Sequence, residues 1–138
     1  MHIPIRIDYG VRALVDLAQH QDEAPLRAAD IARRQGIPEP FLARLLLTLS
    51  RSGFVSSHTG PQGGHSLARD PAAINLGMVM TALGGMETIV GCLDNPEVCI
   101  HVPACAQREV WRTVEEAVQR VLDSTTIADL VERTPVAA

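Results

Sequence analysis

The feature that most constrains the fold is a pair of short apolar helices separated by a glycine turn. Ala32 provides a small side chain where two helices would cross, and Gly36 follows four residues later, where a tight turn after a helix favours a positive φ. Apolar residues then recur at helical spacing, at Leu42, Leu45, Leu46 and Leu49. This order predicts a helix-turn-helix, whose second helix is free to enter a groove of DNA.

A hairpin is predicted directly after the second helix. Residues 54–58 and 66–69 have the composition of short strands, and residues 59–64, Thr-Gly-Pro-Gln-Gly-Gly, form a turn-rich tip. A hairpin taken alone is more often an ordinary surface feature. Because it follows a helix-turn-helix, the interpretation as a wing is favoured.

Two further helices flank this unit. An N-terminal helix carries Val11, Leu14, Val15 and Ala18 on one face, with Asp8 as its cap or first-turn acid. A short helix is capped by Asn75 and ended by Gly84 and Gly85.

A long helix is predicted from about Ala106 to Leu122. Its apolar residues alternate at spacings of three and four, at Trp111, Val114, Val118, Val121 and Thr125. Packing on its own domain is one role, but a long helix beyond a complete winged helix has little local core to cover. A homodimer interface is therefore favoured. Thr126 and Asp129 resemble a capping box that opens a last short helix.

The predicted fold is mainly α: a winged helix-turn-helix with a small β-hairpin wing and a long C-terminal dimerisation helix. Residues 1–84 form the DNA-binding region, and residues 85–105 form a cysteine-bearing loop. Residues 106–138 hold the dimerisation helix and the short C-terminal helix.

Composition excludes several classes of protein. No apolar run approaches the roughly 18–20 residues that span a bilayer, and the N-terminus lacks the pattern of a signal peptide. We therefore expect a cytoplasmic protein with no membrane partner. The motifs G-x-S-x-G, P-loop and H-E-x-x-H do not occur, so no enzyme is expected. Residues 1–70 hold eight Arg against seven acids, so the net charge of −4 arises in the second half.

The three cysteines lie close together, with the spacing Cys92-x6-Cys99-x5-Cys105. Structural zinc sites prefer paired, tighter spacings, and ferredoxin-type clusters use four thiolates. Three thiolates on a loop suit an iron–sulfur cluster whose fourth ligand comes from elsewhere, and Cys105 begins a helix, where the backbone dipole favours a thiolate. By spacing alone, a metal or cluster site and a redox-active thiol set are equally supported.

The segment CLDNPEVCIHVPACAQREVW, residues 92–111, closely resembles the Rrf-two family of iron–sulfur regulators, of the IscR, NsrR and RirA type. The resemblance extends to DYGVRAL at residues 8–14, DIA at 30–32, QGI at 35–37, GPQGG at 60–64 and VLDSTTIADL at 121–130. It implies a regulator, more commonly a repressor, that binds double-stranded promoter DNA as a homodimer. A two-iron two-sulfur or four-iron four-sulfur cluster then reports redox, nitric oxide or iron status.

The resemblance also implies a ligand set. Cys92, Cys99 and Cys105 are the thiolate ligands, and Asp8 from the partner subunit or His101 supplies the fourth. The alternatives are a helix cap for Asp8 and an ordinary loop histidine at His101. A cluster-free thiol switch or a zinc site in a winged-helix regulator also stays open. A small redox protein would leave the helix-turn-helix unexplained.

The predicted DNA contacts lie on the two helices of the helix-turn-helix and on the wing. They are Arg34, Pro40, Arg44, Thr48, Arg51, His58, Thr59 and Gln62. Relatives usually carry an arginine where this chain has Thr59, and an aromatic residue where it has His65. A wing without that arginine loses attraction for phosphates and narrow grooves, for which His58 compensates only when protonated.

Overall fold

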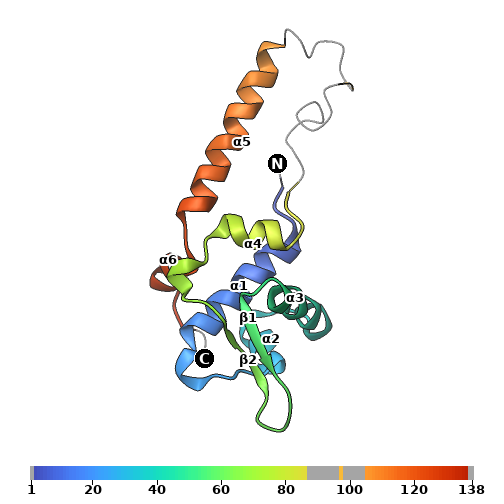
Figure 1. Cartoon of the computed structure of the whole chain (residues 1–138), viewed down its shortest axis with the longest axis vertical. Coiled ribbons are helices and arrows are strands. Elements are labelled where there is room, and N and C mark those ends of the chain that lie inside the picture. The colour runs from blue at the N-terminus through green and yellow to red at the C-terminus, as the bar shows by residue number, and fades with distance from the viewer. Residues whose placement is uncertain (1, 87–96, 98–104, 137–138) are drawn as a thin grey trace.

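The computed structural model describes residues 2–86, 97 and 105–136. The elements before the cysteine segment are α1 (Ile5–Gln19), η1 (Gln21–Glu23), α2 (Ala28–Gln35), α3 (Glu39–Arg51), β1 (Val55–His58), β2 (Gly64–Leu67), η2 (Pro71–Ala73) and α4 (Leu76–Ala82). After it come α5 (Ala106–Ser124) and α6 (Ile127–Arg133). Figure 1 shows a helical core with a two-stranded wing below it and α5 projecting above it. The predicted mainly α fold with a small hairpin wing is confirmed.

The turn between α2 and α3 forms at the predicted glycine. Gly36 has a φ of 64°, in the left-handed region, and a Cβ there would contact nothing within 4 Å. Backbone conformation rather than crowding therefore selects glycine at this position. The Ile37 N–H donates to the Ala32 carbonyl at 3.0 Å, which closes the turn and turns the chain into α3.

Helix α1 lies at the centre of the core and is packed on several sides by other helices. Leu14 and Val15 are buried as predicted, but Val11 and Ala18 are only half-buried, and Ala13 and Leu17 are buried in their place. The reason is that α2, α3, α4 and α6 all pack against α1. The apolar spacing from Val11 to Ala18 predicted one buried face of α1, whereas the four helices together cover more than one of its faces.

The wing begins its second strand earlier than predicted, at Gly64. The strands β1 and β2 are antiparallel, with Val55 opposite Leu67. The backbone of His65 also exchanges hydrogen bonds with Leu26, at 2.8 and 2.7 Å. The contact with Leu26 gives β2 a second neighbouring backbone. Glycine is needed at residue 64 because a Cβ there would lie 2.6 Å from the Leu26 carbonyl oxygen.

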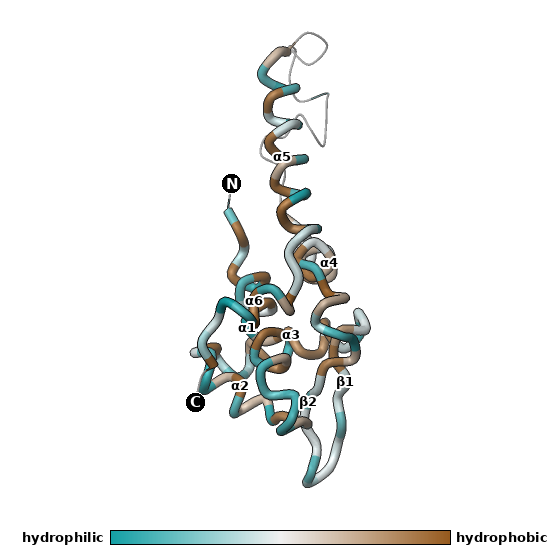
Figure 2. The backbone as a smooth tube through the Cα atoms, turned by 90° about the vertical axis from the view of Figure 1, so that its left-hand side faces the viewer, coloured by the Kyte–Doolittle hydropathy of each residue, from teal (hydrophilic) through white to brown (hydrophobic). Residues whose placement is uncertain are grey.

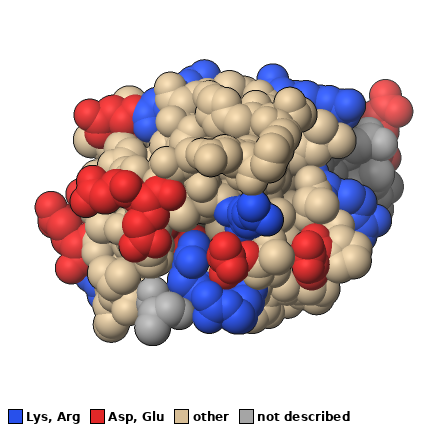
Figure 3. All heavy atoms as spheres, turned by 90° about the horizontal axis from the view of Figure 1, so that it is seen from below, with Lys and Arg blue, Asp and Glu red and all other residues tan. Residues whose placement is uncertain are grey.

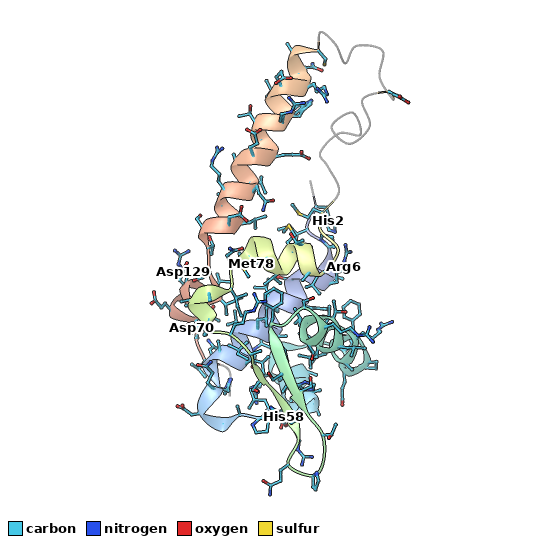
Figure 4. The ribbon with its side chains drawn as sticks, in the orientation of Figure 1. His2, Arg6, His58, Asp70, Met78 and Asp129 are labelled. Carbon is cyan, nitrogen blue, oxygen red and sulfur yellow. The ribbon has the colours of Figure 1, made fainter. Side chains whose placement is uncertain are left out.

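Helix α4 has the predicted ends. The Asn75 side chain accepts a hydrogen bond from the Met78 N–H at 2.8 Å, and Gly84 and Gly85 follow with φ values of 97° and 69°. The Arg6 guanidinium donates to the carbonyls of Leu83 and Gly85 at 2.6 and 3.2 Å. Figure 4 shows Arg6 beside this end of α4, so the N-terminal helix fixes the point from which the cysteine segment departs.

Helix α5 is attached to the core at its C-terminal end. The Leu76 N–H donates to the Thr125 carbonyl at 2.9 Å, and the Ile127 N–H donates to the Ile74 carbonyl at 2.8 Å. Thr126 and Asp129 form the predicted capping box, and Ile127 is fully buried. Helix α6 therefore packs on α1 as part of the core, although the sequence grouped it with the long helix. Within the described residues, no helix is both long and apolar enough to cross a membrane.

Candidate nucleic-acid interface and cysteine segment

The outward face of α3 is formed by residues spaced four, three and four apart. These are Pro40, Arg44, Leu47 and Arg51, all exposed. Leucines at the complementary positions of the helix are buried, so the core fixes which face of α3 points outward. Arg44 and Arg51 lie where the sequence predicted them. Leu47 was not predicted, because the sequence alone does not distinguish it from the buried leucines of the same helix.

Thr48 lies at the side of this face rather than at its centre. It is half-buried, and its hydroxyl donates to the Arg44 carbonyl at 3.2 Å within the helix. It lines a pocket of about 280 Å³ together with Arg44 of α3 and with Ala82 and Leu83 at the end of α4. Thr48 is therefore less exposed than expected of a residue on the outward side of α3.

An aromatic pair supports the Arg44 side chain. The guanidinium carbon of Arg44 lies 5.5 Å from the centre of the Phe41 ring. That ring meets the Tyr9 ring edge-on, with 5.5 Å between centres and 84° between planes. On the other side, the Arg12 guanidinium carbon lies 5.6 Å from the Tyr9 ring centre. These cation–π and edge contacts tie α1 to α3 and restrict where Arg44 points.

The wing presents its predicted residues at the surface. His58, Thr59 and Gln62 are exposed, and Figure 4 places His58 on the hairpin. The tip is held by Arg27, which donates to the Pro61 carbonyl at 2.9 Å. Across the strands, the Ser57 hydroxyl and His65 Nδ1 lie 3.0 Å apart. Burial, and then the nearby His58, lower the pKa of His65, which favours its uncharged form.

Arg34 differs from the other predicted contacts. Its Nε and Nη2 donate to the two carboxylate oxygens of Asp16 at 2.9 and 2.7 Å, and its side chain is only 7% exposed. Asp16 is fully buried and also accepts from Gln35 at 2.9 Å. The Asp16 carboxylate raises the pKa of Arg34. The Arg34 guanidinium thus joins α2 to α1, whereas the other residues predicted to contact DNA have no buried ion pair among the described contacts.

The sequence held one signal for this pair. Asp16 lies between Val15 and Leu17 in the middle of an apolar helix, and a buried carboxylate requires a positively charged partner. Nothing local indicates which arginine provides it.

Charge on the wing end of the molecule is mixed. Figure 3 views the molecule from this end and shows separate arginine patches, with acidic patches at the left, beside the central arginines and at the upper right. A continuous basic surface would give strong binding to any DNA. The described residues on the face in this view do not form such a surface.

Within the cysteine segment, between Cys92 and Cys105, the structure describes residue 97 and the last residue, Cys105. Cys105 is half-buried and is the N-cap of α5. Cys92, Cys99 and His101 lie outside the described residues. Asp8 lies in the first turn of α1, which Pro4 caps, and its carboxylate pairs with Arg12 at 2.9 Å with both side chains 47% exposed. In the part of the chain that the structure describes, no three His, Cys, Asp or Glu side chains gather to hold a metal.

Known proteins resemble the chain over nearly its full length. The model of the Rrf2 family, described as "Iron-dependent Transcriptional regulator", matches residues 3–133. Protein rrf2 of Nitratidesulfovibrio vulgaris is 37% identical over 131 residues, which cover 95% of this chain and 87% of that protein. Among solved structures, IscR of T. potens has a TM-score of 0.77 at 34% identity, covering 96% of this chain and 88% of that one.

A second structural relative is CymR, the global cysteine regulator of B. subtilis. Its TM-score is 0.82 at 32% identity, and the match covers 98% of this chain and 99% of CymR. The relatives of the present chain are DNA-binding regulators rather than enzymes, in agreement with the helix-turn-helix and wing described above. The chain belongs to the Rrf2 family of winged-helix transcriptional regulators.

Proposed function

We propose that this protein is a homodimeric promoter-binding repressor whose affinity for DNA is controlled by an iron–sulfur cluster on Cys92, Cys99 and Cys105. The observation that carries the proposal is the placement of Cys105 as the N-cap of α5. The cysteine segment joins the end of α4 to the start of α5, so both of its ends lie on helices connected to the DNA-binding core.

The donor set fits the cluster. Three thiolates are ligands that iron–sulfur clusters prefer, and a helix N-terminus such as that at Cys105 favours a negatively charged ligand. When bound, the cluster supplies a redox-active group whose loss or oxidation is the signal. The fourth ligand is Asp8 of the partner subunit or His101. The Asp8–Arg12 ion pair is exposed, and such pairs are weak enough to exchange.

Helix α5 would couple a structural change at the cysteines to the position of the DNA-binding helices. Hydrogen bonds at Leu76 and Ile127 hold the C-terminal end of α5. Gly77 of α4 leaves room for Asp123 and Gln119 of α5 at the same junction. A rearrangement at Cys105 would therefore re-seat α5 as a unit. In a dimer this changes the spacing of the two α3 helices and their fit to successive major grooves.

The dimer interface is assigned to the face of α5 opposite this junction. Val110 and Val121 are 55% and 63% exposed and lie on that face, and Trp111 beside it is 37% exposed. Figure 2 shows apolar and polar residues alternating along α5, which projects from the core. An amphipathic helix of 19 residues with no buried residue of its own is expected to bury its apolar stripe against a second copy.

Val121→Asp is expected to raise the dimer dissociation constant at least tenfold. The two copies would bring a pair of carboxylates into one apolar interface, and 1.4 kcal/mol suffices for a tenfold change. Sedimentation velocity over a concentration series measures it. Val136→Asp makes the same change at a 67% exposed valine in the C-terminal tail and serves as the matched control. Equal dissociation constants for the two variants would remove α5 from the interface.

Anaerobic purification tests the cluster. A visible absorption spectrum and assays of iron and acid-labile sulfide on one sample should give coloured protein with comparable amounts of both. Colourless protein that lacks iron and sulfide after reconstitution would overturn this part of the proposal. The second candidate, a cluster-free thiol-switch regulator, would then stand, and the similarity to the cysteine regulator CymR favours it next. Zinc in stoichiometric amount would assign the cysteines to a zinc site.

Arg44→Ala is expected to weaken specific DNA binding by five- to hundredfold. The Arg44 guanidinium is exposed on α3 and supported by Phe41, and a bidentate arginine contact to a base is worth about 1–3 kcal/mol. Fluorescence anisotropy at one fixed salt concentration measures the effect. The control is Arg133→Ala, which removes an exposed arginine from α6. Unchanged affinity in Arg44→Ala would exclude Arg44 from the contacts.

A further inference from the structure

We infer that Leu47 is a specificity-determining residue that contacts the C5-methyl group of a thymine in the major groove. The inference rests on the proposed DNA-binding function, because it requires α3 to enter that groove. It adds an apolar contact to the outward face of α3, where Arg44 and Arg51 are the charged residues.

Leu47 is distinguished from the other leucines of α3 by its exposure. Leu42, Leu45, Leu46 and Leu49 are between 0% and 6% exposed, whereas Leu47 is 51% exposed. A single exposed leucine is common on protein surfaces and does not by itself indicate a function. Its position on the helix is therefore what matters.

That position is the centre of the outward face. Leu47 lies three residues after Arg44 and four before Arg51, and side chains at these spacings are neighbours on a helix surface. Thr48, the adjacent polar residue, is half-buried, and its hydroxyl is bonded to the Arg44 carbonyl. Between the two arginines, the surface offered to DNA is the isobutyl group of Leu47.

The chemistry of the groove then selects the base. In the major groove thymine presents a methyl group beside its O4 acceptor, whereas the other bases present hydrogen-bond donors and acceptors and no methyl group. Leucine has no polar atom in its side chain, so placing it on those groups would strip them of water without replacing the lost hydrogen bonds. Placing it on a methyl group removes apolar surface from water on both partners.

The same geometry predicts where the thymine lies. Neighbouring side chains on a helix are about 5–6 Å apart, and base pairs are stacked about 3.4 Å apart along the axis. The thymine contacted by Leu47 should therefore lie one or two base pairs from the position that Arg44 contacts. Figure 1 shows α3 in the core and α5 projecting from it, so this face is separate from the proposed dimer interface.

The test replaces thymine by deoxyuridine, which lacks only the methyl group. A preferred duplex is first selected from a random library with the full-length protein, and each thymine is then replaced in turn. At one or two positions in each half-site, deoxyuridine should lower the affinity of the unaltered protein about fourfold. This factor corresponds to about 0.8 kcal/mol for one buried methyl group.

Variants assign the effect to Leu47. Leu47→Ala should bind the thymine duplex less tightly by a similar factor and should no longer distinguish deoxyuridine at those positions. Leu47→Met should keep the distinction. Val136→Ala, which shortens an exposed valine away from α3, should leave both affinities unchanged. Because Leu47 is exposed, all variants should fold, which far-UV circular dichroism checks.

Three results would overturn the inference. The first is an unaltered protein that binds every deoxyuridine duplex as tightly as the thymine duplex. The second is a Leu47→Ala protein that still distinguishes them. The third is a change of oligomeric state in Leu47→Ala, which would assign the side chain to a protein interface. An unaltered protein that bound no duplex at all would overturn the proposed function and this inference with it.

Discussion

Cys99→Ala is expected to give a folded dimer that holds no iron–sulfur cluster. The proposed site has three thiolates and one further ligand, and removing the central thiolate leaves three protein ligands in place of the four that these clusters take. Iron and acid-labile sulfide per protomer, measured after anaerobic purification, should fall to background together with the visible absorption. The buried core that the structure describes is formed by other residues, and Cys105 is only half-buried, so we expect the fold not to depend on this thiol.

Controls separate ligation from structure in this experiment. Val98→Ala changes the neighbouring side chain and keeps all three thiols, so it should retain iron and sulfide. Sedimentation and far-UV circular dichroism should be the same for both variants. A Cys99→Ala protein that aggregates or becomes monomeric would assign Cys99 a structural role. A variant that retains full iron and sulfide would remove Cys99 from the ligand set.

Asp16→Ala is expected to lower the free energy of unfolding by about 3–5 kcal/mol, the effect of removing one partner of a buried ion pair. The Asp16 carboxylate is fully buried and accepts three side-chain hydrogen bonds, two from Arg34 and one from Gln35. Without it, a guanidinium that is 7% exposed loses its counter-ion. Since domains are stable by about 5–15 kcal/mol, this is a large part of the total.

Urea denaturation at one fixed protein concentration measures the change, because the stability of a dimer depends on concentration. Glu109→Ala is the control. It breaks the exposed pair between Glu109 and Arg112, at 3.4 Å, and should cost less than about 1 kcal/mol. The double variant Asp16→Leu/Arg34→Leu removes both charges and should recover most of the loss. A loss below about 1 kcal/mol in Asp16→Ala, or no recovery in the double variant, would contradict this account.

The Asp16–Arg34 pair also bears on the position of the helix that follows the Gly36 turn. Arg34 and Gln35 are the last residues before the Gly36 turn, so their contacts with Asp16 hold the end of α2 against α1. The position of α3 follows from that contact. The contacts of Arg34 and Gln35 with Asp16 thus help to fix where α3 starts.

Several features follow from the sequence because their signals lie within a few residues of one another. The Gly36 turn, the Asn75 cap and the Thr126–Asp129 capping box formed as predicted. Each depends on the φ preference of one residue or on a hydrogen bond that spans three positions. The alternation of buried leucines in α3 was equally clear, since four of them follow the period of one helix.

Other features were decided by contacts between distant parts of the chain. Asp16 and Arg34 are separated by 18 positions, and Ile127 enters the core through a hydrogen bond to Ile74. The start of β2 at Gly64 depends on the approach of Leu26. Leu47 became notable only when packing left it uncovered.

The physical reason for this division is the range of the interactions. Backbone preferences and capping hydrogen bonds act within about one turn of helix, so the residues that specify them are adjacent in the sequence. The partner of a buried charge, the depth of a side chain and the edge of a strand depend on which helices pack together. By itself, the sequence determined the elements and their family; the tertiary structure decided which arginine binds a carboxylate and which leucine faces outward.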